Sequence, residues 1–142
     1  MRLQLPIPRA PDDGTSAGEA RAIRILIVED DYFVALELEH RLLEAGYDVV
    51  GIAATAEDAL DKARSGSPDL AVMDIRLAGP RDGIEAATKL MGLGIPSIFA
   101  TAHADAETKR RAEQAQPRGW LQKPYSPEAV IALIEQALAK QN

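Results

Sequence analysis

Short apolar runs and longer segments with helical spacing alternate along the chain. The clearest run, residues 70–73, closely follows a Gly-Ser-Pro turn sequence and ends at the carboxylate of Asp74. A short apolar run bounded by turn residues is typical of a strand buried on both faces of a parallel sheet. Side chains at the carboxyl end of such a strand point into a crevice where ligands bind. The pattern therefore predicts a central strand with a candidate functional residue, Asp74, at its end.

Four further segments have the apolar, β-rich composition of strands, and helical periodicity fills the intervals between them. The strands are expected at residues 23–28, 47–53, 96–101 and 118–122. Gly46 is a suitable stop for the first helix, and Ser126 followed by Pro127 marks the start of the last. The helices are expected at residues 34–45, 56–64, 82–91, 104–115 and 127–140.

The alternation of strands and helices, with no hairpin signal between strands, predicts a parallel sheet covered on both faces by right-handed crossovers. Five such units in about 120 residues favour an α/β fold of the flavodoxin-like (βα)5 type, a doubly wound sandwich with strand order 2-1-3-4-5. In that order the first and third strands are neighbours. The acids at their ends are therefore expected to meet in one pocket.

Length and composition indicate one folded domain preceded by a tail. The chain has 142 residues, of which 46% are hydrophobic, and this suffices for a single core. Residues 1–22 contain three prolines and show neither strand nor helix periodicity, so we interpret them as a flexible N-terminal tail. Residues 23–142 are expected to form the domain.

The net charge of -6 gives no electrostatic reason for binding to nucleic acid or to an anionic membrane. The short basic cluster at residues 109–111 is interpreted as a solvated helix face. The absence of cysteine excludes disulfides, thiolate metal sites and cysteine nucleophiles. No apolar stretch approaches the roughly 20 residues that span a bilayer, and no signal peptide is evident. We expect a soluble, cytoplasmic protein.

Carboxylates cluster at the ends of two strands. Glu29 and Asp30 follow the first strand, and Asp74 ends the third. Converging carboxylates repel one another unless a cation lies among them, and Mg²⁺ with its oxygen ligands is the natural candidate. Thr101 supplies a hydroxyl after the fourth strand, and Lys123 an ammonium group after the fifth. A carboxylate in such company is arranged to attack phosphorus, which predicts an aspartyl phosphate at Asp74.

These motifs at the ends of the first, third, fourth and fifth strands resemble the receiver domains of two-component response regulators, over residues 23–139. The resemblance implies that Asp74 is the phosphoacceptor, that Asp30 binds Mg²⁺ directly, and that Glu29 binds it through water. It implies that the backbone carbonyl of Arg76 is a further metal ligand.

The resemblance also implies that Thr101 and Lys123 contact phosphoryl oxygens, and that Trp120 occupies the position of the switch aromatic. Two features depart from the family pattern. Gly83 lies one residue farther from Asp74 than is common, so the loop between them is expected to keep metal ligation but to change shape. The switch position holds Trp rather than Tyr or Phe, so we expect the larger ring to swing inward less freely.

Among the remaining polar residues, Asp31 is expected to open the first helix, and His40 to lie on the surface. His103 is expected to border the pocket and, with Arg76, to control how water reaches the acyl phosphate. The implied partner is a sensor histidine kinase or a histidine phosphotransfer protein. No further domain follows the last predicted helix, so we expect a stand-alone receiver that signals by protein contact or acts as a phosphate sink. A homodimer is a further possibility.

Two other classes of protein remain open, and a third, a flavin-binding protein, is weaker still. A receiver-like binding module that is never phosphorylated would not need the intact acid cluster. A phosphatase or phosphotransferase would normally need a second acid two residues after Asp74, where the chain has Arg76. A flavin-binding protein would need a phosphate cradle where the chain has three consecutive acids. The resemblance therefore favours a protein that is not an enzyme, apart from self-catalysed phosphotransfer and autodephosphorylation.

Overall fold

Five parallel strands form a single sheet in the computed structural model, which describes residues 21–139. The strand order is β2-β1-β3-β4-β5, as predicted, and every neighbouring pair is parallel. The predicted tail lies almost entirely outside the described residues. The strands are β1 (Arg24–Val28), β2 (Asp48–Ala53), β3 (Leu70–Asp74), β4 (Ser97–Thr101) and β5 (Trp120–Gln122).

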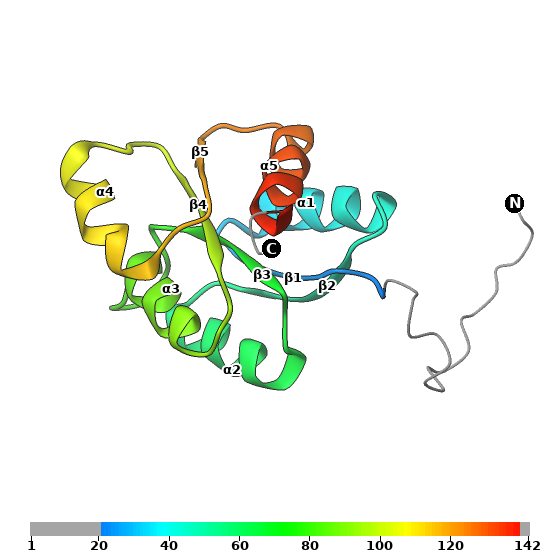
Figure 1. Cartoon of the computed structure of the whole chain (residues 1–142), viewed down its shortest axis with the longest axis horizontal. Coiled ribbons are helices and arrows are strands. Elements are labelled where there is room, and N and C mark those ends of the chain that lie inside the picture. The colour runs from blue at the N-terminus through cyan, green and yellow to red at the C-terminus, as the bar shows by residue number, and fades with distance from the viewer. Residues whose placement is uncertain (1–20, 140–142) are drawn as a thin grey trace, which may run out of the picture.

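Helices cover both faces of the sheet (Figure 1). In this view α1 and α5 lie above it, and α2 and α3 lie below it. A short 3₁₀ turn, η1 (Glu113–Ala115), follows α4. The helices are α1 (Tyr32–Glu44), α2 (Ala56–Gly66), α3 (Gly83–Gly92), α4 (Ala106–Ala112) and α5 (Pro127–Ala139).

Alternate side chains of the central strands enter two separate hydrophobic clusters. On β1, Ile25 and Ile27 pack with α1 and α5, whereas Leu26 and Val28 pack with α2 and α3. All five residues of β3 are buried. This burial on both faces is the physical reason why the sequence showed continuous apolar runs instead of an alternating pattern. The predicted flavodoxin-like fold is thus confirmed.

Aspartate side chains cap the first turns of α1 and α4. Asp31 caps α1, because its carboxylate accepts hydrogen bonds from the N–H groups of Phe33 and Val34 at 3.1 and 3.3 Å; its expected place at the start of the helix is confirmed. The fourth helix was predicted over residues 104–115 but is shorter. Asp105 caps it through the N–H of Thr108 at 2.8 Å, and its last turn tightens into η1 before Gln116 takes a left-handed conformation.

The loop after β3 contacts the loop before α2. The N–H of Ala78 donates to the carbonyl of Ala54 at 3.1 Å, and Ala78 forms a parallel bridge with Thr55. Gly79 has a φ of +89°, which favours glycine. An ion pair of 3.5 Å between Arg81 and Glu57 adds a second contact. Two neighbouring loops at the carboxyl edge of the sheet are thus joined.

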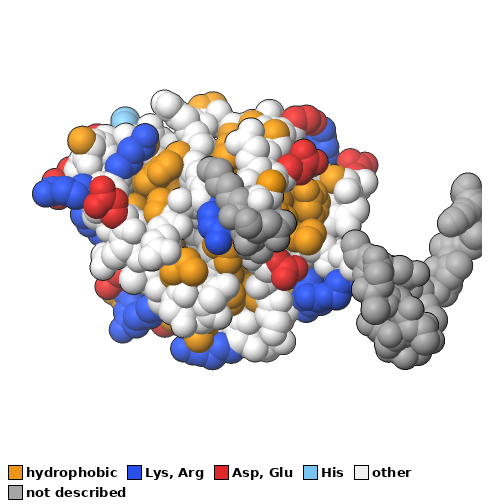
Figure 2. Space-filling model, viewed as in Figure 1, with side chains coloured by type: hydrophobic (Ala, Val, Ile, Leu, Met, Phe, Trp, Pro, Cys, Tyr) orange, Lys and Arg blue, Asp and Glu red, His pale blue; other side chains and the backbone are white. Residues whose placement is uncertain are grey.

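Hydrophobic side chains gather on the face between α4 and α5, and Lys and Arg side chains surround α4 (Figure 2). The large hydrophobic residues with the greatest exposure among those described are Tyr32, Phe33, Leu43 and Leu93. Within residues 21–139, none of the helices has the length and apolar character that crossing a membrane requires.

Candidate functional site

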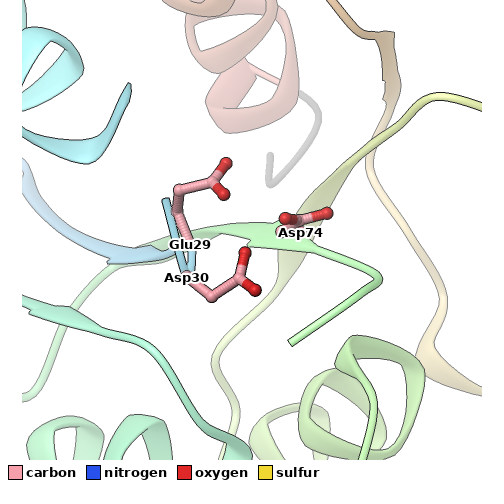
Figure 3. A group of neighbouring side chains, drawn as sticks. All are labelled: Glu29, Asp30 and Asp74. Atoms are coloured by element: carbon pink, nitrogen blue, oxygen red, sulfur yellow. The ribbon is translucent and has the colours of Figure 1, made fainter. Parts of the chain in front are cut away.

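Three acidic side chains meet at the carboxyl edge of the sheet (Figure 3). Glu29 and Asp30 directly follow β1, and Asp74 ends β3, which lies beside β1. One carboxylate oxygen from each residue lies within 4.8 Å of the others. Glu29 and Asp74 are only 4% and 6% exposed, whereas Asp30 is exposed to solvent. The topology therefore brings together the three acids that the sequence singled out.

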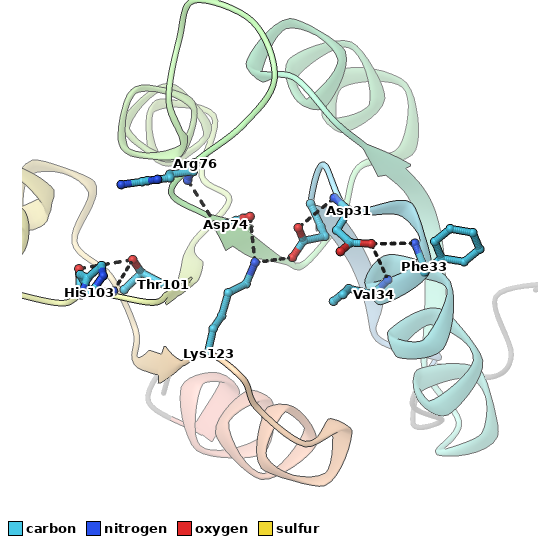
Figure 4. A network of polar contacts seen from close by, with 9 residues as sticks. Asp31, Phe33, Val34, Asp74, Arg76, Thr101, His103 and Lys123 are labelled. Carbon is cyan, nitrogen blue, oxygen red and sulfur yellow. Dashed lines mark hydrogen bonds and ion pairs between the residues drawn. The ribbon is translucent and has the colours of Figure 1, made fainter.

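Lys123 lies between Glu29 and Asp74, and Figure 4 shows its side chain pointing toward Asp74. Its ammonium nitrogen is 2.9 Å from Glu29 Oε1 and 3.0 Å from Asp74 Oδ2. Burial lowers the pKa of Lys123, but the hydrogen bonds to Glu29 and Asp74 outweigh this effect and raise its pKa to about 12. The ammonium group therefore stays charged and neutralises part of the acid cluster.

The environment of Glu29 resists its ionisation. Burial raises the pKa of this carboxyl above 4.5, and the nearby Asp74 raises it further. The N–H of Asp31, 3.0 Å from Oε2, and the ammonium of Lys123 lower the pKa, but they do not cancel the effect of burial. A site that makes the carboxylate form costly is one in which an additional cation would be favourable.

Arg76 and Thr101 complete the inner part of the site. The backbone N–H of Arg76 donates to Asp74 Oδ1 at 3.3 Å, while its side chain is exposed. Thr101 is buried at the end of β4. Its hydroxyl accepts from the N–H of His103 at 3.2 Å and lies 3.3 Å from the carbonyl of the same residue. Thr101 thus lies at the site but is hydrogen-bonded to the following loop.

All these residues line one cavity of about 740 Å³. His103 borders it, as expected, whereas His40 is on the surface of α1 and lies 3.3 Å from Glu44. The lining also includes four polar or charged residues that the sequence analysis did not assign to the site: Asp82, Asp105, Thr108 and Arg111.

The sequence pattern that defines the Response regulator receiver domain matches residues 25–135. The chain belongs to this family. Receivers are components of two-component systems, and membership implies a histidine kinase partner. The pocket formed by Glu29, Asp30 and Asp74 is typical of phosphoacceptor receivers, and the three acids suit a metal ion as in Mg²⁺-binding receivers. A receiver is not a classical enzyme.

Individual relatives agree with this assignment. The receiver is 35% identical over 127 residues to the transcriptional regulatory protein PdtaR of Mycobacterium tuberculosis; the match covers 89% of this chain but only 62% of PdtaR. The signal receiver domain of a modulated diguanylate cyclase from Desulfovibrio desulfuricans G20 has a TM-score of 0.77 and 39% identity, covering 84% of this chain and 95% of that one. A CheY-like receiver domain protein from Methanospirillum hungatei JF-1 has a TM-score of 0.78 and 32% identity, covering 84% and 96%.

Trp120 of this receiver is half-buried on β5 and held between two neighbours. Its ring centroid lies 5.1 Å from that of Phe99, and the ammonium nitrogen of Lys109 lies 5.4 Å from its ring centroid. The ring packs against the cluster on the α2 and α3 side of the sheet. Contact with an aromatic ring and with a cation stabilises this position.

Three of the four polar residues missed by the sequence analysis lie in α4 or cap it, and the fourth caps α3. Asp82 and Asp105 are helix caps, which accept from the N–H groups of Glu85 and Thr108, and the spacing of these caps was visible in the sequence. Arg111 was interpreted as part of a solvated helix face. It is half-exposed, but its guanidinium donates to Asp82 Oδ2 at 2.8 Å. Arg111 and Asp82 are 29 positions apart along the chain, and no sequence signal indicates that residues so far apart form a pair.

Proposed function

We propose that this receiver accepts a phosphoryl group on Asp74 from a phosphohistidine of a sensor histidine kinase or a histidine phosphotransfer protein, in the cytoplasm. The observation that carries the proposal is the convergence of Asp74 with Glu29, Asp30 and Lys123 in one cavity. A buried carboxylate beside an ammonium group and a potential cation site is suited to attack on phosphorus.

The donor set fits Mg²⁺, since this ion prefers oxygen ligands and keeps several of its waters. Glu29 uses one oxygen for Lys123 and the other for the N–H of Asp31, which suits contact with the ion through water. Asp30, Asp74 and the backbone carbonyl of Arg76 would bind directly. When bound, the ion would neutralise charge on the transferring oxygens.

In the proposed step, a carboxylate oxygen of Asp74 forms a bond to phosphorus as the bond between phosphorus and the donor imidazole breaks. The released imidazole takes up a proton from solvent. The ammonium of Lys123 pairs with one phosphoryl oxygen, and the hydroxyl of Thr101 turns from His103 to donate to another. Each of these side chains lies on the lining of the same cavity.

Two residues at the mouth of the cavity are proposed to control the return reaction with water. The side chain of Arg76 and the residue His103 are exposed and border the acid cluster. They are placed to shield the acyl phosphate or to orient a water molecule near it. If Arg76→Ala and His103→Ala together leave the dephosphorylation rate unchanged, this role is excluded.

The donor is proposed to bind beside the first cavity. A second, largely apolar cavity of about 520 Å³ shares Asp31, Ala102 and Lys123 with the first, and α1, the loop between β5 and α5, and the start of α5 line the rest. Phe33, which is 83% exposed, lies in the first turn of α1, two residues after the capping residue Asp31. A phosphohistidine that approached Asp74 across this second cavity would bring its protein onto the exposed start of α1. Phe33→Ser should therefore slow transfer from the donor protein and leave labelling by phosphoramidate unchanged.

Output is proposed to proceed by protein contact on the surface formed by α4, β5 and α5, or by removal of phosphate from the donor. The contact mode is supported by the hydrophobic side chains on this face (Figure 2) and by Trp120 on β5. A second copy of the chain is one possible occupant. Phosphorylation-dependent elution in size-exclusion chromatography would detect it.

The deciding experiment is intact-mass measurement after incubation with acetyl phosphate or phosphoramidate and Mg²⁺. We expect one added phosphoryl group, which is lost with EDTA and in Asp74→Asn. An unchanged mass, under conditions that label a control receiver, would favour a binding module that is not phosphorylated.

A further inference from the structure

An ion pair joins α4 to the loop that follows the phosphoacceptor strand. The guanidinium of Arg111 donates to Asp82 Oδ2 at 2.8 Å. The other oxygen of Asp82 accepts from the N–H of Glu85 at 3.0 Å and caps α3. Burial raises the pKa of Asp82, but the hydrogen bonds from Arg111 and from the Glu85 N–H outweigh it and hold the pKa below its ordinary value. Each oxygen of this carboxylate therefore has a separate role.

The body of the protein holds α4 through few contacts. Of its seven residues, Ala112 is buried and Thr108 is half-buried, while the others are exposed. The helix lies at the edge of the molecule beside α3 (Figure 1). Two charged side chains of α4 contact other elements: Arg111 pairs with Asp82, and Lys109 lies over the ring of Trp120. An element with so little burial can shift at small energetic cost.

Arg111, Asp82 and Asp74 line the same cavity. A phosphoryl group on Asp74 would add negative charge and up to three acceptor oxygens to that cavity. Guanidinium groups bind phosphoryl oxygens through two parallel hydrogen bonds, which a carboxylate already engaged in a helix cap cannot match. Asp82 and the phosphoryl group would therefore compete for Arg111.

We propose that Arg111 is a positioning residue that holds α4 on Asp82 in the unphosphorylated receiver and exchanges Asp82 for the phosphoryl group on Asp74. This inference rests on the proposed function of Asp74. It couples the charge in the cavity to the position of α4 by a route that does not require Trp120 to turn. Lys109 lies on the same helix, so movement of α4 changes the surroundings of Trp120, the single tryptophan of the chain.

Two variants separate the contributions of the pair. Asp82→Asn removes the charge that holds Arg111 but keeps an oxygen that can cap α3. Arg111→Gln removes the guanidinium, and Arg111→Lys restores a cation. Arg110→Gln is the matched control, because Arg110 is the adjacent residue on α4 and pairs with Glu107 inside the helix.

In the unphosphorylated protein, hydrogen exchange of residues 106–112 should rise about 1.5- to 5-fold in Asp82→Asn and Arg111→Gln, the range expected for loss of an exposed ion pair. Arg110→Gln removes only an ion pair inside α4 and no contact with the rest of the protein, so its exchange should rise less than in either of these variants. Equal exchange in all four proteins would overturn the proposal without bearing on phosphorylation of Asp74.

Phosphorylation with phosphoramidate and Mg²⁺ then tests whether Arg111 exchanges Asp82 for the phosphoryl group. Intact mass and Trp120 fluorescence are measured on the same samples. We expect Arg111→Gln to gain the phosphoryl group but to lose at least about half of the wild-type fluorescence change, and Arg111→Lys to recover most of it. A full fluorescence change in phosphorylated Arg111→Gln would overturn the inference alone. Failure of the wild type to gain mass would instead overturn the proposed function, and this inference with it.

Discussion

The ammonium nitrogen of Lys123 lies 3.0 Å from Asp74 Oδ2, although 49 positions separate the two residues. Both are at carboxyl ends of strands, and the same ammonium reaches Glu29 Oε1 at 2.9 Å. The two buried acids of the site therefore share one cation, which neutralises only part of their charge. This arrangement leaves Asp30 as the acid most accessible to an ion from solution.

Lys123→Gln should destabilise the protein in the absence of Mg²⁺. Two buried carboxylates would lose their charged partner, so we expect the free energy of unfolding to fall by about 1–3 kcal/mol. Phosphoryl incorporation should slow by at least about tenfold, since the cation that faces the transferring oxygens is lost. Urea unfolding in EDTA and the rate of mass gain measure the two effects. Lys89→Gln, on the exposed side of α3, is the control, and equal behaviour of the two variants would contradict the prediction.

Glu29 should make stability depend on pH when no Mg²⁺ is present. Because burial raises its pKa in the folded state, the folded protein binds this proton more tightly than the unfolded chain does. The contribution of Glu29 to stability therefore grows as the pH falls from neutrality through the raised pKa towards 4.5, and it is lost as the pH rises.

Glu29→Gln removes this proton and keeps the shape of the side chain. The free energy of unfolding of the variant minus that of the wild type should be larger at pH 7 than at pH 4.5. Urea midpoints measured across this interval in EDTA test the sign. Parallel curves for the two proteins would show that Glu29 has the same pKa in the folded and unfolded states.

Asp30→Asn should weaken Mg²⁺ binding. The exposed carboxylate of Asp30 belongs to the acid triad, and its charge favours the ion directly. We expect the affinity to fall by at least about tenfold, which is about 1.4 kcal/mol. Mg²⁺ stabilises the folded state by mass action, so the Mg²⁺-dependent rise in melting temperature measures the change. Asp31→Asn keeps the cap of α1 and should bind Mg²⁺ like the wild type; an equal loss in both variants would point to net charge alone.

Gly83→Ala should be far more harmful than Gly92→Ala in the same helix. A Cβ on Gly83 would lie 2.0 Å from the carbonyl oxygen of Asp74, whereas a Cβ on Gly92 would meet nothing within 4 Å. The first change should cost at least about 2 kcal/mol, because backbone would have to move next to the phosphoacceptor. The second should be neutral or should stabilise by about 0.5 kcal/mol. Thermal unfolding of both variants provides the comparison, and similar melting temperatures would contradict it.

The sequence was sufficient for the parts of the molecule that depend on burial. Continuous apolar runs are required of strands covered on both faces, so β1, β3 and β4 and the strand order could be predicted. Since parallel strands end at one edge, the meeting of Glu29, Asp30, Asp74 and Lys123 followed from the topology.

The sequence was insufficient where few apolar contacts fix the position of an element. The fourth helix buries only Ala112 fully, so helical periodicity could not set its ends. The pair between Arg111 and Asp82 depends on the orientation of that helix and on two side-chain rotamers. The periodicity of hydrophobic residues in the sequence indicates neither of these. The hydrogen bond of Thr101 with His103 is likewise a property of loop geometry.

The bridge between Thr55 and Ala78 has a consequence for engineering chimeric receivers. With Arg81 paired to Glu57, it makes the segment after β3 and the segment that leads into the first turn of α2 one exchangeable unit, although more than 20 residues separate them. A graft of the β3–α3 segment from a relative with a shorter connection would leave Ala54, Thr55 and Glu57 without their partners. Transplants into this scaffold should therefore carry both segments from the same parent.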